Sequence, residues 1–228
     1  MKRYENTVIL AFGDTHAPYH HKETLAFLEY VKERYEPNRV IHTGDLLDIY
    51  SVSAYPKDTD HPDSWKKEIK QGRKFVTKLA KIFPKLDLLE SNHDDRAYKK
   101  SRLAGVPREF MLPYRNIVGA PDGWKWHRHL KITVDSTREQ IFFAHHKTGG
   151  SLICAKDLGC SCVLGHKHST FGATSFKPTG KKLLWGIDAG CLISDKGAPY
   201  AYNKLDRGRP IQGCVIIQDG VPTMIPLN

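Results

Sequence analysis

The sequence lacks the features that mark several specialised classes of protein. None of its 228 residues belong to a long hydrophobic run, and the first residues contain no apolar signal region. There is no internal repeat, no low-complexity segment and no linker long enough to divide the chain. We therefore expect a cytoplasmic protein without a membrane partner, folded as a single domain over residues 1-228, and we leave its oligomeric state open.

Cysteine is scarce and is confined to the second half of the chain. The five cysteines are Cys154, Cys160, Cys162, Cys191 and Cys214. An odd number argues against a disulfide framework. The segment Cys160-Ser161-Cys162 lacks the spacing and the second cysteine pair of a zinc site. We expect buried thiols in a reducing compartment.

Negative charge is also in short supply. The chain has 35 Lys and Arg residues against 25 Asp and Glu, which gives a formal net charge of +10 and a pI of about 9.3. This balance favours a polyanionic partner, and nucleic acid (DNA or RNA) is the first candidate. The alternative is a basic protein that its charge keeps soluble, with no such partner. A hydrophobic content of 40% is ordinary for a globular protein.

Five short apolar runs are each followed by side chains that can bind metals. The runs and the residues after them are Val8–Phe12 before Asp14 and His16, Val40–Thr43 before Asp45, Leu86–Leu89 before Asn92, Ile141–Ala144 before His145, and Cys162–Leu164 before His166 and His168. Such runs predict buried strands. Ligands bind at the carboxyl ends of strands in open α/β sheets. We expect the seven side chains to converge on one crevice.

The rest of the chain predicts a mixed α/β fold. Helices are expected at 23–35, 64–83, 95–103, 107–112 and 151–158, and a polar loop at 53–63. Hairpins are expected to pair 124–134 with 140–144, 171–176 with 183–188, and 211–218 with 221–226. The helix at 23–35 joins the first two strands in a βαβ unit, so these strands should be parallel.

Two predicted helical regions are strongly basic. The helix at 64–83 has an apolar stripe that begins at Trp65, and its other face bears Lys66, Lys67, Lys70, Arg73, Lys74, Lys78 and Lys81. The region after the third strand contains Arg96, Lys99, Lys100, Arg102 and Arg108. Either face could track nucleic acid phosphates or could simply be solvated, and the sequence leaves both interpretations open.

Taken in order, the motifs resemble those of the calcineurin-like metallophosphoesterases. They are Asp14-Thr15-His16, Gly44-Asp45-Leu46-Leu47-Asp48, Asn92-His93-Asp94, His145 and Gly165-His166-Lys167-His168. Two positions depart from the family pattern: Ser91 replaces a glycine, and His146 stands where many members have glycine. The resemblance implies the α/β fold class, as a four-layer α/β/β/α sandwich of two mixed sheets with a dinuclear metal centre at the strand ends.

The resemblance also implies the roles of the site residues. One metal ion would be held by Asp14, His16, Asp45 and His168. The other would be held by Asp45, Asn92, His145 and His166, with Asp45 as the bridge. His93 would be the catalytic histidine and Asp94 the acidic residue that orients it. The cofactors would be two divalent ions, manganese first, with iron, nickel, zinc or cobalt as alternatives.

The expected activity is hydrolysis of phosphate esters by a hydroxide that two metal ions activate, with His93 protonating the leaving oxygen. Arg96 would add a phosphate contact, unless it is a plain surface arginine. The first hypothesis is a phosphodiesterase or nuclease acting on DNA or RNA. The second is a phosphatase acting on nucleotides or phosphoproteins, although Ile49 stands where the protein phosphatases have arginine. The third is a non-catalytic metal-binding scaffold, which usually lacks a ligand or the histidine; none is missing here.

Overall fold

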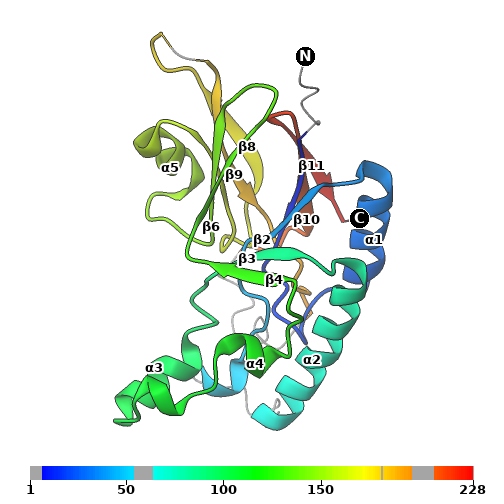
Figure 1. Cartoon of the computed structure of the whole chain (residues 1–228), viewed down its shortest axis with the longest axis vertical. Helices are drawn as coiled ribbons and strands as arrows, with labels where there is room; N and C mark the ends of the chain where they lie inside the picture. Colours follow the sequence, from blue (N-terminus) through cyan, green and yellow to red (C-terminus); the bar gives the residue numbers. More distant parts are fainter. Residues whose placement is uncertain (1–6, 54–63, 181, 197–207, 228) are drawn as a thin grey trace.

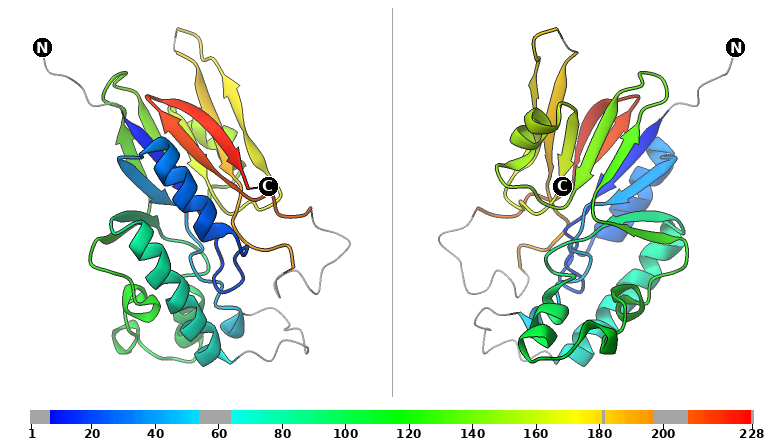
Figure 2. Two further views of the ribbon diagram at one scale, coloured as in Figure 1. Left: turned by 90° about the vertical axis from the view of Figure 1, so that its right-hand side faces the viewer. Right: turned by 60° about the vertical axis from the view of Figure 1, so that its left-hand side comes forward.

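The computed structural model describes residues 7–53, 64–180, 182–196 and 208–227. Two sheets face each other, with helices on both outer faces (Figures 1 and 2). The order in the six-stranded sheet is β11 (Val221–Pro226), β10 (Gly213–Gln218), β1 (Val8–Phe12), β2 (Arg39–His42), β3 (Leu86–Leu89) and β4 (Trp124–His127). The order in the five-stranded sheet is β5 (Leu130–Thr133), β6 (Gln140–Ala144), β7 (Ser161–Leu164), β9 (Leu184–Ala189) and β8 (Phe171–Phe176).

The helices complete the four layers that the sequence predicted. They are α1 (Thr24–Tyr35), α2 (Trp65–Ile82), α3 (Arg96–Leu103), α4 (Tyr114–Val118) and α5 (Gly150–Leu158), with short 3₁₀ turns η1 (Tyr50–Val52) and η2 (Arg108–Phe110). Helices α1 and α2 cover the six-stranded sheet, and α5 covers the five-stranded sheet (Figure 2). Figure 1 shows α3 and α4 beyond the ends of the strands.

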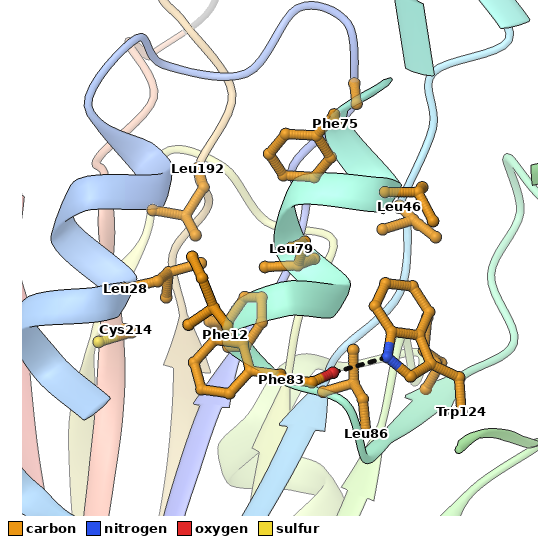
Figure 3. Close-up of a cluster of buried hydrophobic side chains, with 14 of the residues drawn as sticks. Phe12, Leu28, Leu46, Phe75, Leu79, Phe83, Leu86, Trp124, Leu192 and Cys214 are labelled. Carbon is orange, nitrogen blue, oxygen red and sulfur yellow. Dashed lines mark hydrogen bonds between the residues drawn. The ribbon is translucent and has the colours of Figure 1, made fainter. Parts of the chain in front are cut away.

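The contacts of strand β1 show why the sequence runs predicted as buried strands are apolar at every position. Leu10 and Phe12 pack toward the helices, whereas Ile9 and Ala11 pack between the two sheets. Successive side chains of a strand point to opposite faces, so a strand covered on both faces needs apolar residues at every position. Figure 3 shows the helix-side core, in which the indole Nε1 of Trp124 donates a hydrogen bond to the Phe83 carbonyl at 2.8 Å.

Parallel pairing places together the carboxyl ends of the strands that precede the predicted ligands. Strand β1 is parallel to β2, β2 to β3, and β6 to β7. The βαβ prediction is thereby confirmed. The loops after these five strands all leave from carboxyl ends, and this is the position of ligand sites in α/β sheets.

The predicted strand at 124–134 is wrong. The segment divides into β4, which pairs parallel with β3, and β5, which pairs antiparallel with β6 in the other sheet. The reason lies in the partners of its side chains. Trp124 packs in the helix-side core, whereas Ile132 and Val134 pack in the core between the sheets. In one straight strand these three side chains, which are an even number of positions apart, would all point to the same face, so the strand must break for them to reach different cores.

The helices agree with the prediction at the start of α2 and differ from it in other details. Ser64 caps α2 as expected, because its Oγ accepts a hydrogen bond from the Lys67 N–H at 3.4 Å. Trp65, however, is 57% exposed, and the buried face includes Glu68, whose carboxylate accepts hydrogen bonds from backbone N–H groups of η1. The helix expected at 107–112 is only the short turn η2, and α4 was not predicted. Of the loop expected at 53–63, residues 54–63 lie outside the described residues.

The five cysteines are buried free thiols, in line with the sequence expectation. Within the described ranges, no helix combines the length and the apolar character needed to cross a lipid bilayer.

Candidate metal centre

Loops after five strands bring the seven predicted metal ligands together. Asp14 and His16 follow β1, Asp45 follows β2, Asn92 follows β3, His145 follows β6, and His166 and His168 follow β7. The chain turns sharply at several of them. Asp14, Asp45 and His166 have φ angles of 49°, 52° and 71°. Left-handed backbone is unfavourable for residues with a Cβ atom, and such strain occurs mainly at functional sites.

The first group of donor atoms comes from Asp14, His16, Asp45 and His168. One donor atom from each lies within 4.8 Å of all the others. The Nε2 atoms of His16 and His168 are 3.1 Å apart, and Asp14 Oδ1 is 3.2 Å from His168 Nε2. Asp45 Oδ2 lies 3.5 Å from His16 Nε2. All four side chains are therefore directed at one small volume.

The second group shares Asp45 with the first. One donor atom from each of Asp45, His145 and His166 likewise lies within 4.8 Å of the other two. Asp45 Oδ2 lies 3.4 Å from His145 Nε2, and His166 Nδ1 lies 3.2 Å from the same nitrogen. The amide oxygen of Asn92 is 2.7 Å from His145 Nε2. Asp45 is thus positioned to contribute to both groups, as a bridging carboxylate must.

The donor set fits two divalent cations. A neutral imidazole has one N–H, so the Nε2 atoms of His16 and His168, which lie 3.1 Å apart, can form at most one hydrogen bond with each other. Both nitrogens are directed at the same space. Burial alone would raise the pKa of Asp45, but His145 and His93 outweigh it and hold that pKa well below its usual range. Burial opposes protonation of His145, yet Asp45 raises its pKa to about 9. The buried carboxylates therefore require positive charge, and mixed nitrogen and oxygen donors suit manganese, iron or zinc.

His93 lies beside the two groups and is oriented by Asp48. Its Nδ1 donates to the Asp48 carbonyl oxygen at 2.8 Å and lies 3.0 Å from Asp48 Oδ1. Its Nε2 is 3.7 Å from Asp45 Oδ2. The guanidinium of Arg96 reaches Asp48 Oδ1 at 2.7 Å and His93 Nε2 at 2.8 Å. Arg96 is therefore part of this arrangement and not a plain surface arginine.

The carboxylate that contacts the His93 ring is Asp48, and we infer that Asp48 has the orienting role that the sequence analysis assigned to Asp94. The Asp94 carboxyl is buried beside the hydroxyls of Tyr114 and Ser91, and among the described residues none of its contacts is to the His93 ring. Burial, together with the charge of Asp45, raises its pKa to about 7. The sequence did contain the signal for the correct residue. Asp48 is the second carboxylate of the Gly44–Asp48 motif, but no role was given to it.

Asp48→Asn tests this correction, because it removes the charge behind His93 and keeps the side-chain shape. We expect turnover to fall roughly 10- to 100-fold, as is typical for a group that orients a reacting or ligating side chain. Metal content and the thermal midpoint are measured beside turnover, because Asp48 Oδ1 also lies 3.7 Å from His16 Nδ1 and 2.7 Å from the Arg96 guanidinium. Asp94→Asn is the matched control, since it neutralises the neighbouring carboxyl without touching His93. A larger loss in Asp94→Asn than in Asp48→Asn would restore the original assignment.

Comparisons with known proteins agree with the motifs. The family model described as calcineurin-like phosphoesterase matches residues 7–170. Gene 54 protein of Mycobacterium phage L5 is 26% identical over 226 residues, which cover 84% of this chain and 82% of that protein.

Solved structures align over most of the chain at low identity. Vacuolar Protein Sorting 29 from Cryptosporidium parvum aligns with a TM-score of 0.45 and 14% identity, over 96% of this chain and 95% of that one. Nuclease MPE from Pseudomonas putida aligns with a TM-score of 0.35 and 15% identity, over 96% and 87%. The family model provides the assignment, because it matches more than half of the sequence and includes every ligand from Asp14 to His168: the chain belongs to the calcineurin-like phosphoesterase family.

Proposed function

We propose that the protein is a metal-dependent phosphodiesterase that cleaves DNA or RNA. Its family supports metal-dependent hydrolysis of phosphate esters. The observation that carries the proposal is the complete set of converging donors around Asp45, with His93 already oriented next to it. The free thiols agree with a reducing compartment, so we place the protein in the cytoplasm.

The chemistry follows from these positions. Bound divalent cations, manganese first among the candidates, would neutralise the phosphoryl oxygens and activate the attacking water. Asp14, His16 and His168 would hold one ion, Asn92, His145 and His166 the other, and Asp45 both. His93 is held through Nδ1 by Asp48, and its Nε2 faces the guanidinium of Arg96, which can only donate. His93 would protonate the leaving oxygen from Nε2 once Arg96 has turned from that nitrogen to the substrate and Nε2 carries a proton. Arg96, whose guanidinium lies at His93 Nε2, is placed to contact a phosphoryl oxygen.

Helix α2 supports a nucleic acid partner. Lys66, Lys70 and Lys74 are exposed at successive turns and line a shallow groove of about 360 Å³. Arg73 lies in the same groove but holds α4 in place, because its guanidinium donates to the carbonyl oxygens of Ile117 and Asn116. The three lysines are therefore the cations of this groove that are available to track a phosphate backbone.

Reversing these three charges should weaken nucleic acid binding without affecting the chemistry. The variant Lys66→Glu, Lys70→Glu, Lys74→Glu should flatten the salt dependence of affinity, by about 0.7–0.9 in logarithmic slope for each phosphate that it no longer neutralises. Hydrolysis of a small p-nitrophenyl ester should not change. Fluorescence anisotropy with DNA and RNA across salt concentrations gives the slope. Reversal of Arg34, Lys85 and Lys131, which lie on other surfaces, is the control. If the two triple variants behave alike, the α2 face is only a solvated surface.

A substrate panel tests the proposed function itself. The purified protein is assayed with manganese against bis-p-nitrophenyl phosphate, p-nitrophenyl phosphate, and single- and double-stranded DNA and RNA. We expect hydrolysis of the diesters and of at least one nucleic acid. Activity on the monoester alone would instead support the phosphatase that acts on nucleotides or phosphoproteins. Tight metal binding with no hydrolysis would indicate the non-catalytic scaffold.

A further inference from the structure

A cleft of about 860 Å³ opens on one side of the metal centre. Asn92, His145 and His166, which belong to the second donor group, form part of its lining. His93 contacts the first group instead, since its ring packs edge-on against His16 with ring centroids 4.4 Å apart. The cleft therefore opens from the second donor group, whereas the ring of His93 packs against the first.

The walls of the cleft carry four cations and three carboxyl groups, the latter from Glu90, Asp94 and Asp95. The cations are Lys99 from α3, Arg108 from η2, Arg115 from α4 and Arg128 from the link after β4. Lys99 is 3.6 Å from Asp95, and Arg115 is 3.2 Å from Asp122, so both are partly neutralised. No carboxylate of the described residues lies within 4.0 Å of Arg108 or Arg128. These two guanidinium groups are available for an anion.

Aromatic side chains line the same space. The rings of Tyr114 and Trp126 meet edge-on, with centroids 6.2 Å apart. The guanidinium of Arg108 lies 4.5 Å over the ring of Tyr98, whose hydroxyl donates to the Leu112 carbonyl oxygen at 2.7 Å. An aromatic wall beside exposed cations is the combination that binds bases and phosphates of a single strand.

We propose that this cleft binds the nucleotide that remains on phosphorus when the ester is cut, and that the protein is therefore selective for phosphodiesters. The inference rests on the proposed function. The leaving oxygen must lie at His93 to receive its proton, so the second ester substituent points away from His93, toward Asn92 and His166. The cleft volume is within the range of nucleotide-sized pockets. A phosphomonoester has no second substituent and gains nothing from the cleft.

Arg108 and Arg128, the two arginines without a carboxylate partner among the described residues, extend the inference to a second phosphate group of the substrate. The aromatic wall takes the base of the retained nucleotide, and Arg108 and Arg128 take its outer phosphate, because each guanidinium group can donate two parallel hydrogen bonds to phosphate oxygens. A substrate that ends in a free hydroxyl at that point should bind more weakly than one that continues as phosphate.

Four esters with the same leaving group test this. They are p-nitrophenyl phosphate, bis-p-nitrophenyl phosphate, thymidine 5′-(p-nitrophenyl phosphate), and the last compound with a 3′-phosphate. In each case the bond from phosphorus to the p-nitrophenolate oxygen breaks and a bond to the oxygen of water forms. With manganese, we expect kcat/KM to rise in the order given. The gain from the 3′-phosphate should be about 10-fold, mostly in KM, as for a hydrogen bond to a charged group.

The variant Arg108→Ala, Arg128→Ala should lose the gain from the 3′-phosphate and hydrolyse p-nitrophenyl phosphate as the wild type does. Arg34→Ala is the matched control, because its guanidinium also lies over a tyrosine ring, 5.6 Å from that of Tyr35 on α1. Preference for the monoester, or a 3′-phosphate gain that persists in the double variant, would overturn the cleft assignment and leave a phosphoesterase. Absence of hydrolysis of all four esters by the wild type would overturn the proposed function, and this inference with it.

Discussion

Asp45→Asn is expected to abolish binding of the metal pair and nearly all activity. Asp45 is the residue shared by the group of Asp14, His16, Asp45 and His168 and the group of Asp45, His145 and His166, with Oδ2 3.5 Å from His16 Nε2 and 3.4 Å from His145 Nε2. An amide has one oxygen and no charge, so it cannot bridge two cations. The change also removes the negative charge that raises the pKa of His145. His16 and His145 then lose the carboxylate that lies between them.

Elemental analysis of the purified Asp45→Asn variant should find well under two ions per chain. Activity on bis-p-nitrophenyl phosphate should be at background. Asp87→Asn is a suitable control, because that carboxylate pairs with Arg39 and His127 away from the site. Circular dichroism should show that both variants are folded. Two ions per chain with full turnover in Asp45→Asn would mean that another residue is the bridge.

His93→Ala should separate metal binding from chemistry. His93 forms a third possible donor group with His16 and Asp48, but it lies outside the two groups that share Asp45, so we expect the variant to keep the metal ions held there. Loss of a general acid lowers turnover by roughly 10²–10⁴. The loss should be large for a dinucleotide, whose leaving alkoxide needs a proton. It should be much smaller for a p-nitrophenyl ester, whose leaving group is stable as an anion.

The measurement is kcat for both substrates in wild type, His93→Ala and His129→Ala, the last being an exposed histidine outside the site. Metal content by elemental analysis accompanies each. An equal loss with good and poor leaving groups would argue that His93 contacts the phosphoryl oxygens and does not protonate the leaving oxygen.

The strands and the ligand set could be predicted because their signals are local. Each apolar run is continuous, and each ligand follows its run within a few residues, as Asp14 and His16 follow Phe12. A helix between two such runs makes them parallel, which brings their carboxyl ends to one edge. The convergence of the seven side chains followed from these patterns, and the structure brings them together. The four layers were implied by the resemblance of the motifs to the calcineurin-like family, and both the family and the layers are confirmed.

Contacts between distant residues could not be predicted in this way. The carboxylate that contacts the His93 ring is that of Asp48, 45 residues earlier, whereas the adjacent Asp94 lies beside Tyr114. The division of 124–134 between two sheets depended on which core receives Trp124 and which receives Ile132.

The cleft is the clearest product of the tertiary structure. Lys99 and Arg108 appeared in the sequence as members of a basic stretch, with solvation and phosphate binding equally open. Arg128 lay inside a supposed strand. Only the packing of α3, η2 and α4 beyond the strand ends, together with the turn between β4 and β5, places these cations around a space that opens at Asn92 and His145. Local sequence determined which side chains gather at the candidate metal centre, because they follow buried strands, and packing between remote segments decided which side chains line the cleft beside it.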